Sequence, residues 1–126
     1  MPIFVTDHAG AEHLRLKATG SIDIVEMRSA VDHFRAGERR LMPILLDLTE
    51  ATLTFSPGDV AKLAEDRAAE DKRSSLGALA LVATTDEPFG ISRMFKSYSE
   101  ANGRPHVGVF RDAGAAERWL QSLNTH

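Results

Sequence analysis

Polar and charged side chains follow three apolar segments that the sequence predicts to be strands. They are Asp47, Thr49 and Glu50, then Thr84, Thr85 and Asp86, and finally Arg111 and Asp112. Open α/β sheets bind ligands outside the carboxyl ends of their parallel strands. We therefore expect a binding site at this edge, with Ser56 and the backbone near Phe89 as donors to an anion. The alternative is that these residues are polar only because strand ends meet water.

A second candidate site is an apolar and aromatic stripe on one predicted helix. It comprises Phe89, Ile91, Met94, Phe95 and Tyr98, with Arg93 among them. Methionine adapts to irregular guests and aromatic rings offer large contact areas, so the stripe suits an apolar ligand or a protein partner. The helical periodicity alone favours the simpler interpretation, in which the stripe packs on the sheet.

The sequence contains no recognisable catalytic or metal-binding motif. Asp47 and Glu50 are the one pair of carboxylates considered for acid–base work, and paired carboxylates are common on loops. The five histidines have no zinc-motif spacing, and the chain has no cysteine, which excludes disulfides and thiolate sites. Nucleotide-binding and hydrolase fingerprints are also missing. We expect no enzyme activity, no cofactor and no bound metal.

Composition and charge are those of an ordinary globular protein of 126 residues, 43 % of them hydrophobic and 26 % charged. The net charge is −3 with no basic block, so we expect no nucleic-acid partner. The first ten residues lack the features of a signal peptide, and no apolar run approaches the ~18 residues of a membrane span. We expect a soluble cytoplasmic protein without integral membrane association.

The periodicity predicts a single α/β domain over residues 1–126, with five strands and four helices. Residues 12–19 alternate apolar and polar side chains, as in a half-buried strand that pairs antiparallel with residues 3–5. Gly20 is expected to end this strand, Ser21 to open the first helix and Gly37 to stop it. Residues 45–48, Leu-Leu-Asp-Leu, then indicate a strand that is buried on both faces.

The second half alternates strands and helices. Helices are expected at 57–72, at 88–101 and after Asp112, and strands at 78–83 and 106–110. Ser56 and Asp59 are expected to form a capping box, with Pro57 at the first helical position. The order β-β-α-β-α-β-α-β-α requires right-handed crossovers and gives a mixed, mostly parallel sheet. We expect Trp119 in the last helix to be largely buried.

Three segments carry a resemblance to a known fold family. They are Ile44 to Gly58; the Gly20, Ile22 and Asp23 positions; and the run from Leu81 to Leu120 with Arg93-Met94, Tyr98, Val109 to Asp112, Ala116 and Trp119-Leu120. From about Glu12 to Leu123 the chain resembles the SpoIIAA-like or STAS-like domains of bacteria. These domains include anti-sigma-factor antagonists and share a fold with the CRAL-TRIO lipid-transfer domains.

The resemblance implies a binding or interaction module, without the best-known activity of the family. Antagonists usually read Asp-Ser-Ser-Gly where this chain reads Phe55-Ser56-Pro57-Gly58, so proline stands at the phosphate-accepting position. We therefore expect a non-catalytic module that binds a protein partner or a second copy of itself. The alternatives are a carrier of a small apolar or lipid-like ligand, by analogy with CRAL-TRIO domains, and a partner switch of the antagonist type. Expected site residues are Asp47, Thr49, Ser56, Thr84, Asp86, Phe89, Arg93, Met94 and Tyr98.

Overall fold

The computed structural model describes residues 3–7, 13–35 and 41–123 and has the predicted order of elements. The strands are β1 (Ile3–Asp7), β2 (Leu14–Ile22), β3 (Ile44–Leu53), β4 (Leu79–Val82) and β5 (Val107–Phe110). The helices are α1 (Ile24–Phe34), α2 (Pro57–Ser74), α3 (Asp86–Ala101) and α4 (Ala113–Leu123).

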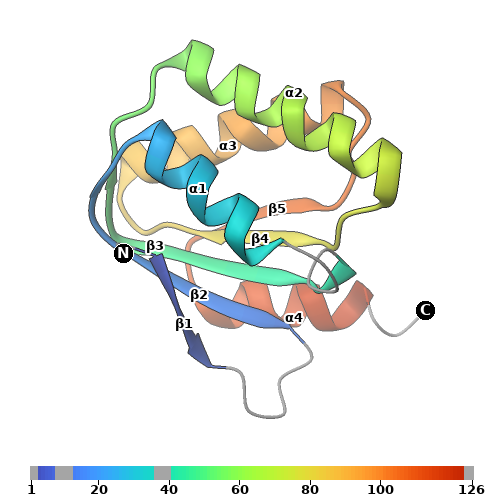
Figure 1. Ribbon diagram of the computed structural model, residues 1–126. Helices are drawn as coiled ribbons and strands as arrows, with labels where there is room; N and C mark the ends of the chain where they lie inside the picture. Colours follow the sequence, from blue (N-terminus) through green and yellow to red (C-terminus); the bar gives the residue numbers. More distant parts are fainter. Residues whose placement is uncertain (1–2, 8–12, 36–40, 124–126) are drawn as a thin grey trace.

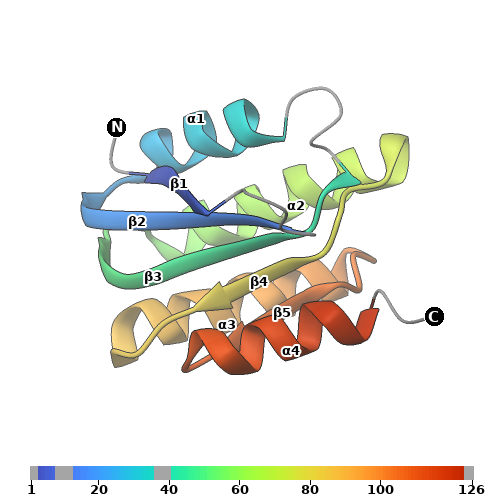
Figure 2. The same ribbon diagram turned by 90° about the horizontal axis from the view of Figure 1, so that it is seen from below.

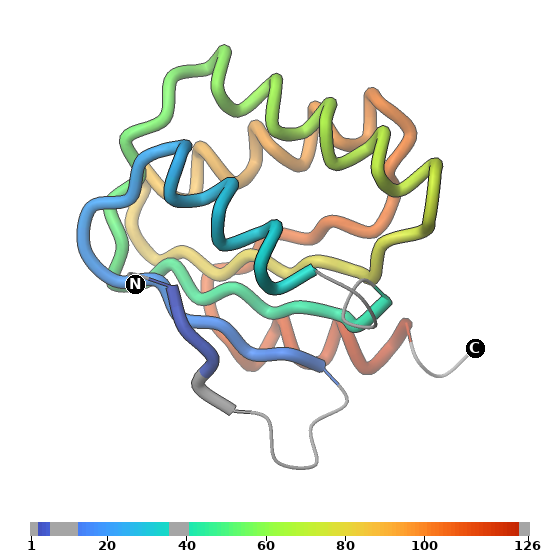
Figure 3. The backbone as a smooth tube through the Cα atoms, viewed as in Figure 1, coloured from blue at the N-terminus to red at the C-terminus, as the bar shows by residue number. Residues whose placement is uncertain are grey.

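The strands form one sheet in the order β1-β2-β3-β4-β5. β1 pairs antiparallel with β2, and every later neighbour pair is parallel, as predicted. Because each parallel connection is a crossover, α1, α2 and α3 all lie on the same face of the sheet (Figures 1 and 3). Helix α4 follows the last strand and covers the opposite face (Figure 2).

Two apolar cores result from the alternation of side chains along the central strands. Leu46 and Leu81 point into the main core, between the sheet and α1–α3, with Val60 and Phe95. Their neighbours point to the other side, where Leu45, Ala80 and Val82 pack against Ala116 and Leu120 of α4. Burial on both faces explains why β3 and β4 are continuously apolar over these residues.

Several predicted boundaries were wrong, for identifiable reasons. Gly20, with a φ of 77°, lies within β2 and not at its end, because β2 pairs with β3 through Ile22. Helix α1 is capped by Asp23 and not by Ser21: its carboxylate accepts from the backbone N–H of Glu26 at 2.8 Å. The predicted stop at Gly37 lies outside the described residues.

Strand β3 runs five residues past the end predicted for it. A bulge interrupts its pairing with β2, where Lys17 faces Asp47 and Thr19 faces Glu50. The extra residue lets the strand bend and continue through a polar stretch that looked like a loop. Asp47 and Thr49 therefore lie within a strand and not at its carboxyl end.

The C-terminal helix packs its tryptophan on the smaller core, as predicted, without burying it fully. Trp119 packs on Phe110, with ring centroids 5.5 Å apart, but its side chain stays partly exposed. Ala116 and Leu120 are the fully buried residues of this face. The ring covers the rim of the smaller core, above Gly108 of β5, where any Cβ would approach it to 3.2 Å.

Candidate functional site

Four of the predicted site residues come together with Arg111 at the carboxyl ends of β4 and β5. The guanidinium of Arg111 donates to the carbonyl of Thr84 at 2.9 Å and lies 3.4 Å from the carboxylate of Asp86. It also stacks on Phe89, 3.7 Å from the ring centroid, and the guanidinium of Arg93 lies 6.0 Å from the same ring. The side chain of Asp86 is fully exposed, so this cluster is a surface feature without an enclosed site.

The remaining predicted residues have local structural roles or separate positions. Asp47 accepts from the backbone N–H of Thr49 at 2.9 Å and from its hydroxyl at 2.6 Å, which stabilises the bulge of β3. Ser56 caps α2 by accepting from the N–H of Asp59 at 3.1 Å, and Asp59 accepts from the N–H of Ser56 at 3.0 Å. The predicted capping box is therefore confirmed.

The stripe on α3 does not lie on a single surface. Phe95 is buried, Met94 is partly buried against the main core, and Tyr98 is exposed. The side of α3 that packs inward is instead centred on Pro88, Ser92, Phe95 and Ser99. The periodicity thus placed Phe95 correctly and Tyr98 incorrectly, since the buried side of α3 carries two serines that the apolar pattern did not include.

The structure contains a cavity of about 90 Å³ within the main core, which is not fully enclosed. Its walls are side chains of β1 to β4 and of the three helices above them, almost all apolar. Leu46 and Leu81 form part of its floor, and Ala30, Leu63, Ile91 and Phe95 part of its roof. The cavity lies between the helical layer and the sheet, and not at the surface cluster around Arg111.

Three arginines interrupt the apolar lining of the cavity: Arg35, Arg67 and Arg104. Arg35 is 8 % exposed and donates to the carbonyls of Met42 at 2.7 Å and Gly77 at 3.0 Å. Arg104 is 3 % exposed and reaches the same Gly77 carbonyl at 3.5 Å. Met42 and Gly77 precede β3 and β4, so these arginines lie near the amino ends of the strands, opposite the predicted site.

The burial of these guanidinium groups is unfavourable for their charges. Burial, followed by the positive charges of Arg104 and Arg67, lowers the pKa of Arg35 to about 9, against the opposing effect of Asp71. Burial likewise lowers the pKa of Arg104 to about 10. A desolvated cation becomes more acidic because the protein replaces water poorly around it. The cavity therefore has one end of positive potential.

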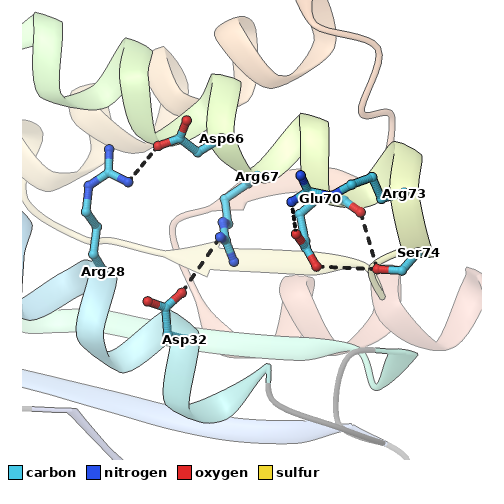
Figure 4. Close-up of polar contacts among 7 residues, drawn as sticks. All are labelled: Arg28, Asp32, Asp66, Arg67, Glu70, Arg73 and Ser74. Atoms are coloured by element: carbon cyan, nitrogen blue, oxygen red, sulfur yellow. Dashed lines mark hydrogen bonds and ion pairs between the residues drawn. The ribbon is translucent and has the colours of Figure 1, made fainter.

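Arg67 connects the cavity with a polar groove on the outside of the molecule. The groove has a volume of about 320 Å³ and lies between α1 and α2. Val31, Leu63 and Arg67 line both spaces and so separate them. Two ion pairs cross from α1 to α2 here: Arg28 with Asp66 at 2.7 Å and Asp32 with Arg67 at 3.7 Å (Figure 4).

Two polar atoms at the cavity are buried without a hydrogen-bond partner among the described residues: Nε of Arg67 and the hydroxyl of Ser92. Buried polar groups are almost always paired, and each exception calls for an explanation such as a missing guest. Neither Arg67 nor Ser92 was among the site residues predicted from the sequence. One signal was available, because Arg67 follows Leu63 by one helical turn and thus falls on the inward face of α2.

Within the described residues, no group of three or more acidic, histidine or cysteine side chains could hold a metal ion. No helix in the described part of the chain is both long and apolar enough to cross a bilayer. The Asp47 carboxylate considered for acid–base work is engaged by Thr49. The arrangement suits binding, because the cavity combines apolar walls with a few polar groups, as small-molecule sites do.

Comparison with solved structures gives the same architecture. An uncharacterised protein of the DUF3478 family from Shewanella loihica PV-4, described as having a SpoIIAA-like fold, is similar with a TM-score of 0.58. The match covers 94 % of this chain and 91 % of that one, at 18 % sequence identity. The chain has a SpoIIAA-like fold. No family model matches the sequence, and neither does any curated protein. At this identity the likeness concerns the fold alone.

Proposed function

We propose that this protein is a non-catalytic binding module whose SpoIIAA-like fold holds a small organic molecule between the helical layer and the sheet. One observation carries this proposal: the cavity of about 90 Å³ in the main core, lined by apolar side chains and a few buried polar groups. Interiors are normally packed without voids larger than a water molecule, so a space of this size is unusual for a domain this small.

The volume limits the guest to a few non-hydrogen atoms. Pockets for drug-sized ligands measure ~300–1,000 Å³, whereas an apolar cavity of ~150 Å³ holds a benzene molecule. A long acyl chain of the kind suggested by the CRAL-TRIO analogy does not fit. Of the ligand-binding alternatives, a compact and mostly apolar guest is therefore the one that the geometry supports.

A partner switch of the antagonist type has less support. Ser56 is occupied as the cap of α2, and Pro57 at the first helical position has no hydroxyl to accept phosphate. Incubation with anti-sigma kinases and ATP, followed by peptide mass spectrometry, should leave Ser56 unmodified. Stoichiometric phosphate on Ser56, together with loss of kinase binding, would make the partner switch the better proposal.

The test of the proposed function is a titration of the methyl NMR spectrum with neutral and charged small guests. Ala30 on α1 is 4 % exposed and faces the cavity, so Ala30→Leu fills part of it. The control is the same substitution at Ala101, an exposed residue at the end of α3. We expect saturable shifts at Leu63 and Leu81 in the wild type and in Ala101→Leu, and at least tenfold weaker binding in Ala30→Leu.

Two results would contradict the proposed function. If none of the small guests gives saturable shifts at the cavity, or if Ala30→Leu binds them as tightly as Ala101→Leu does, the cavity is not a binding site. Native mass spectrometry of gently purified protein complements the titration, because it reports a retained guest and the number of copies in the same spectrum. A dimer without any retained mass would favour the interaction module instead.

A further inference from the structure

We propose that the guest is a small organic anion, a monocarboxylate with a one-carbon apolar part such as acetate, whose charged group binds at the Arg67 side of the cavity. This inference rests on the proposed function and names the chemical class of the ligand. The apolar part would contact the leucines of the floor and roof, and the carboxylate would accept hydrogen bonds from groups that now have none.

The unpartnered atoms of Arg67 and Ser92 are donors, which is the property that a carboxylate requires. The Nε–H of Arg67 can only donate, so its partner must be an acceptor. Ser92 is 2 % exposed and lines the cavity, and its hydroxyl has no partner among the described residues. A purely apolar guest would leave both groups unsatisfied, and each buried unsatisfied group destabilises the folded state by ~1–3 kcal/mol.

The charges at this end of the cavity are mostly positive: three guanidinium groups, with the carboxylate of Asp71 acting on those of Arg35 and Arg104. Beyond the larger effect of burial on each, the charges of Arg104 and Arg67 lower the pKa of Arg35, and the charge of Arg67 lowers the pKa of Arg104. The hydrogen bond found for Arg104 is to a neutral carbonyl, that of Gly77. A carboxylate beside these guanidinium groups would take the place of the water that burial removes from them. Hydrogen bonds between two ionised groups are also roughly twice as strong as those between neutral groups.

The groove outside has a different charge balance, which argues that the inner space is the anion site. In the groove Arg28 is paired with Asp66, and Arg73 with Glu70, whose carboxylate also accepts from Ser74 at 3.4 Å (Figure 4). The outer side of Arg67 faces Asp32. Each arginine of the groove thus has a carboxylate near it, whereas the inward Nε–H of Arg67 has none.

The experiment compares acetate with its neutral relative acetamide by NMR titration of the full chain at pH 7. We expect acetate to bind at least tenfold more tightly, with shifts at Leu63, Leu81 and the side-chain Nε–H of Arg67. Arg67→Met should lower acetate affinity at least tenfold and leave acetamide binding unchanged. The control is Arg118→Met, which removes an exposed arginine from α4 on the opposite face of the sheet.

The outcomes separate this inference from the proposed function. If both guests bind at the cavity with equal affinity, or if Arg67→Met has no effect on acetate binding, the anion inference is wrong and the binding module stands. If neither guest binds at the cavity, both proposals are wrong. Should Arg67→Met fail to fold, the wild-type comparison of the two guests and the Ser92→Ala variant, expected to weaken acetate binding alone, still decide the matter.

Discussion

The guanidinium of Arg67 lies 3.7 Å from the carboxylate of Asp32, and this ion pair joins α2 to α1 directly outside the main cavity. Asp32 is largely exposed, with 73 % of its side chain accessible, whereas 18 % of the Arg67 side chain is. The pair is therefore asymmetric: one partner is in solvent and the other lines the cavity. An anionic guest on the inner side would compete with Asp32 for the same guanidinium.

Removing the charge of Asp32 should strengthen binding of an anionic guest. An ion pair with an exposed partner contributes ~0–1 kcal/mol, and ~1.4 kcal/mol corresponds to a tenfold change in affinity. We therefore expect Asp32→Asn to raise acetate affinity about two- to fivefold, measured by NMR titration. The matched control Glu87→Gln, an exposed charge removed from the start of α3, should have no effect. Weaker binding in Asp32→Asn would mean that Asp32 holds Arg67 in its binding position.

Gly77 cannot accept a side chain without displacing the backbone that Arg35 contacts. A Cβ on Gly77 would lie 2.5 Å from the carbonyl oxygen of Met42 and 2.6 Å from that of Leu41. We expect Gly77→Ala to lower the free energy of unfolding by about 1–3 kcal/mol, as overpacking does. At Gly90 of α3 an added Cβ meets nothing within 4 Å, so Gly90→Ala should stabilise by up to ~1 kcal/mol. Equal effects in urea melts would refute the predicted clash.

The capping box at the start of α2 should contribute measurably to stability. Loss of a serine cap lowers the free energy of unfolding by ~0.5–2 kcal/mol, because one helix N–H loses its partner. Ser56→Ala should fall in this range by chemical denaturation. Ser97→Ala, at an exposed position within α3, should change stability by less than ~0.5 kcal/mol. If the two variants are equally stable, the hydroxyl of Ser56 does not act as the cap in solution.

Acid should weaken the connection between α1 and α2. The hydrogen bond from Arg28, more than any other effect, lowers the pKa of Asp66 below its usual value of 3.8. The stabilisation is therefore present above that value and is lost as the pH falls through the lowered pKa. Between pH 6 and pH 3 we expect the wild type to lose up to ~1 kcal/mol more than Asp66→Asn in urea melts. Parallel pH curves for the two proteins would exclude this contribution. The comparison with Asp66→Asn matters because Glu70, bonded to Arg73, also has a lowered pKa.

Much of the fold could be predicted because its signals are local. The continuous apolar run of β4 and the Ser56-Pro57 helix start depend on a few neighbouring residues each. The errors occur where pairing between distant segments decides the outcome. Gly20 continues β2 because β3 lies beside it, and the bulge at Asp47 carries β3 through a polar stretch.

The candidate site was harder to predict for the same reason. The polar cluster at the strand ends could be anticipated, since the carboxyl ends of parallel strands lie at the same edge of a sheet. Thr84, Asp86 and Phe89 do contact Arg111 there. The cavity could not be anticipated, because it depends on imperfect packing among four strands and three helices. Arginine is usually a surface residue, so the sequence alone predicts an exposed side chain. For Arg67, only its position on the inward side of α2 indicated that it is buried.

The most direct test of the central claim is an isotope-filtered NOE spectrum of the protein with bound acetate. If the guest lies between the helices and the sheet, its methyl group must lie among Leu63 of α2, Leu81 of β4 and Ile91 of α3, since all three line the cavity. We predict intermolecular NOEs to all three residues. Saturable binding with NOEs confined to Phe89 and Arg93, at the carboxyl ends of the strands, would contradict the account and restore the site that the sequence predicted.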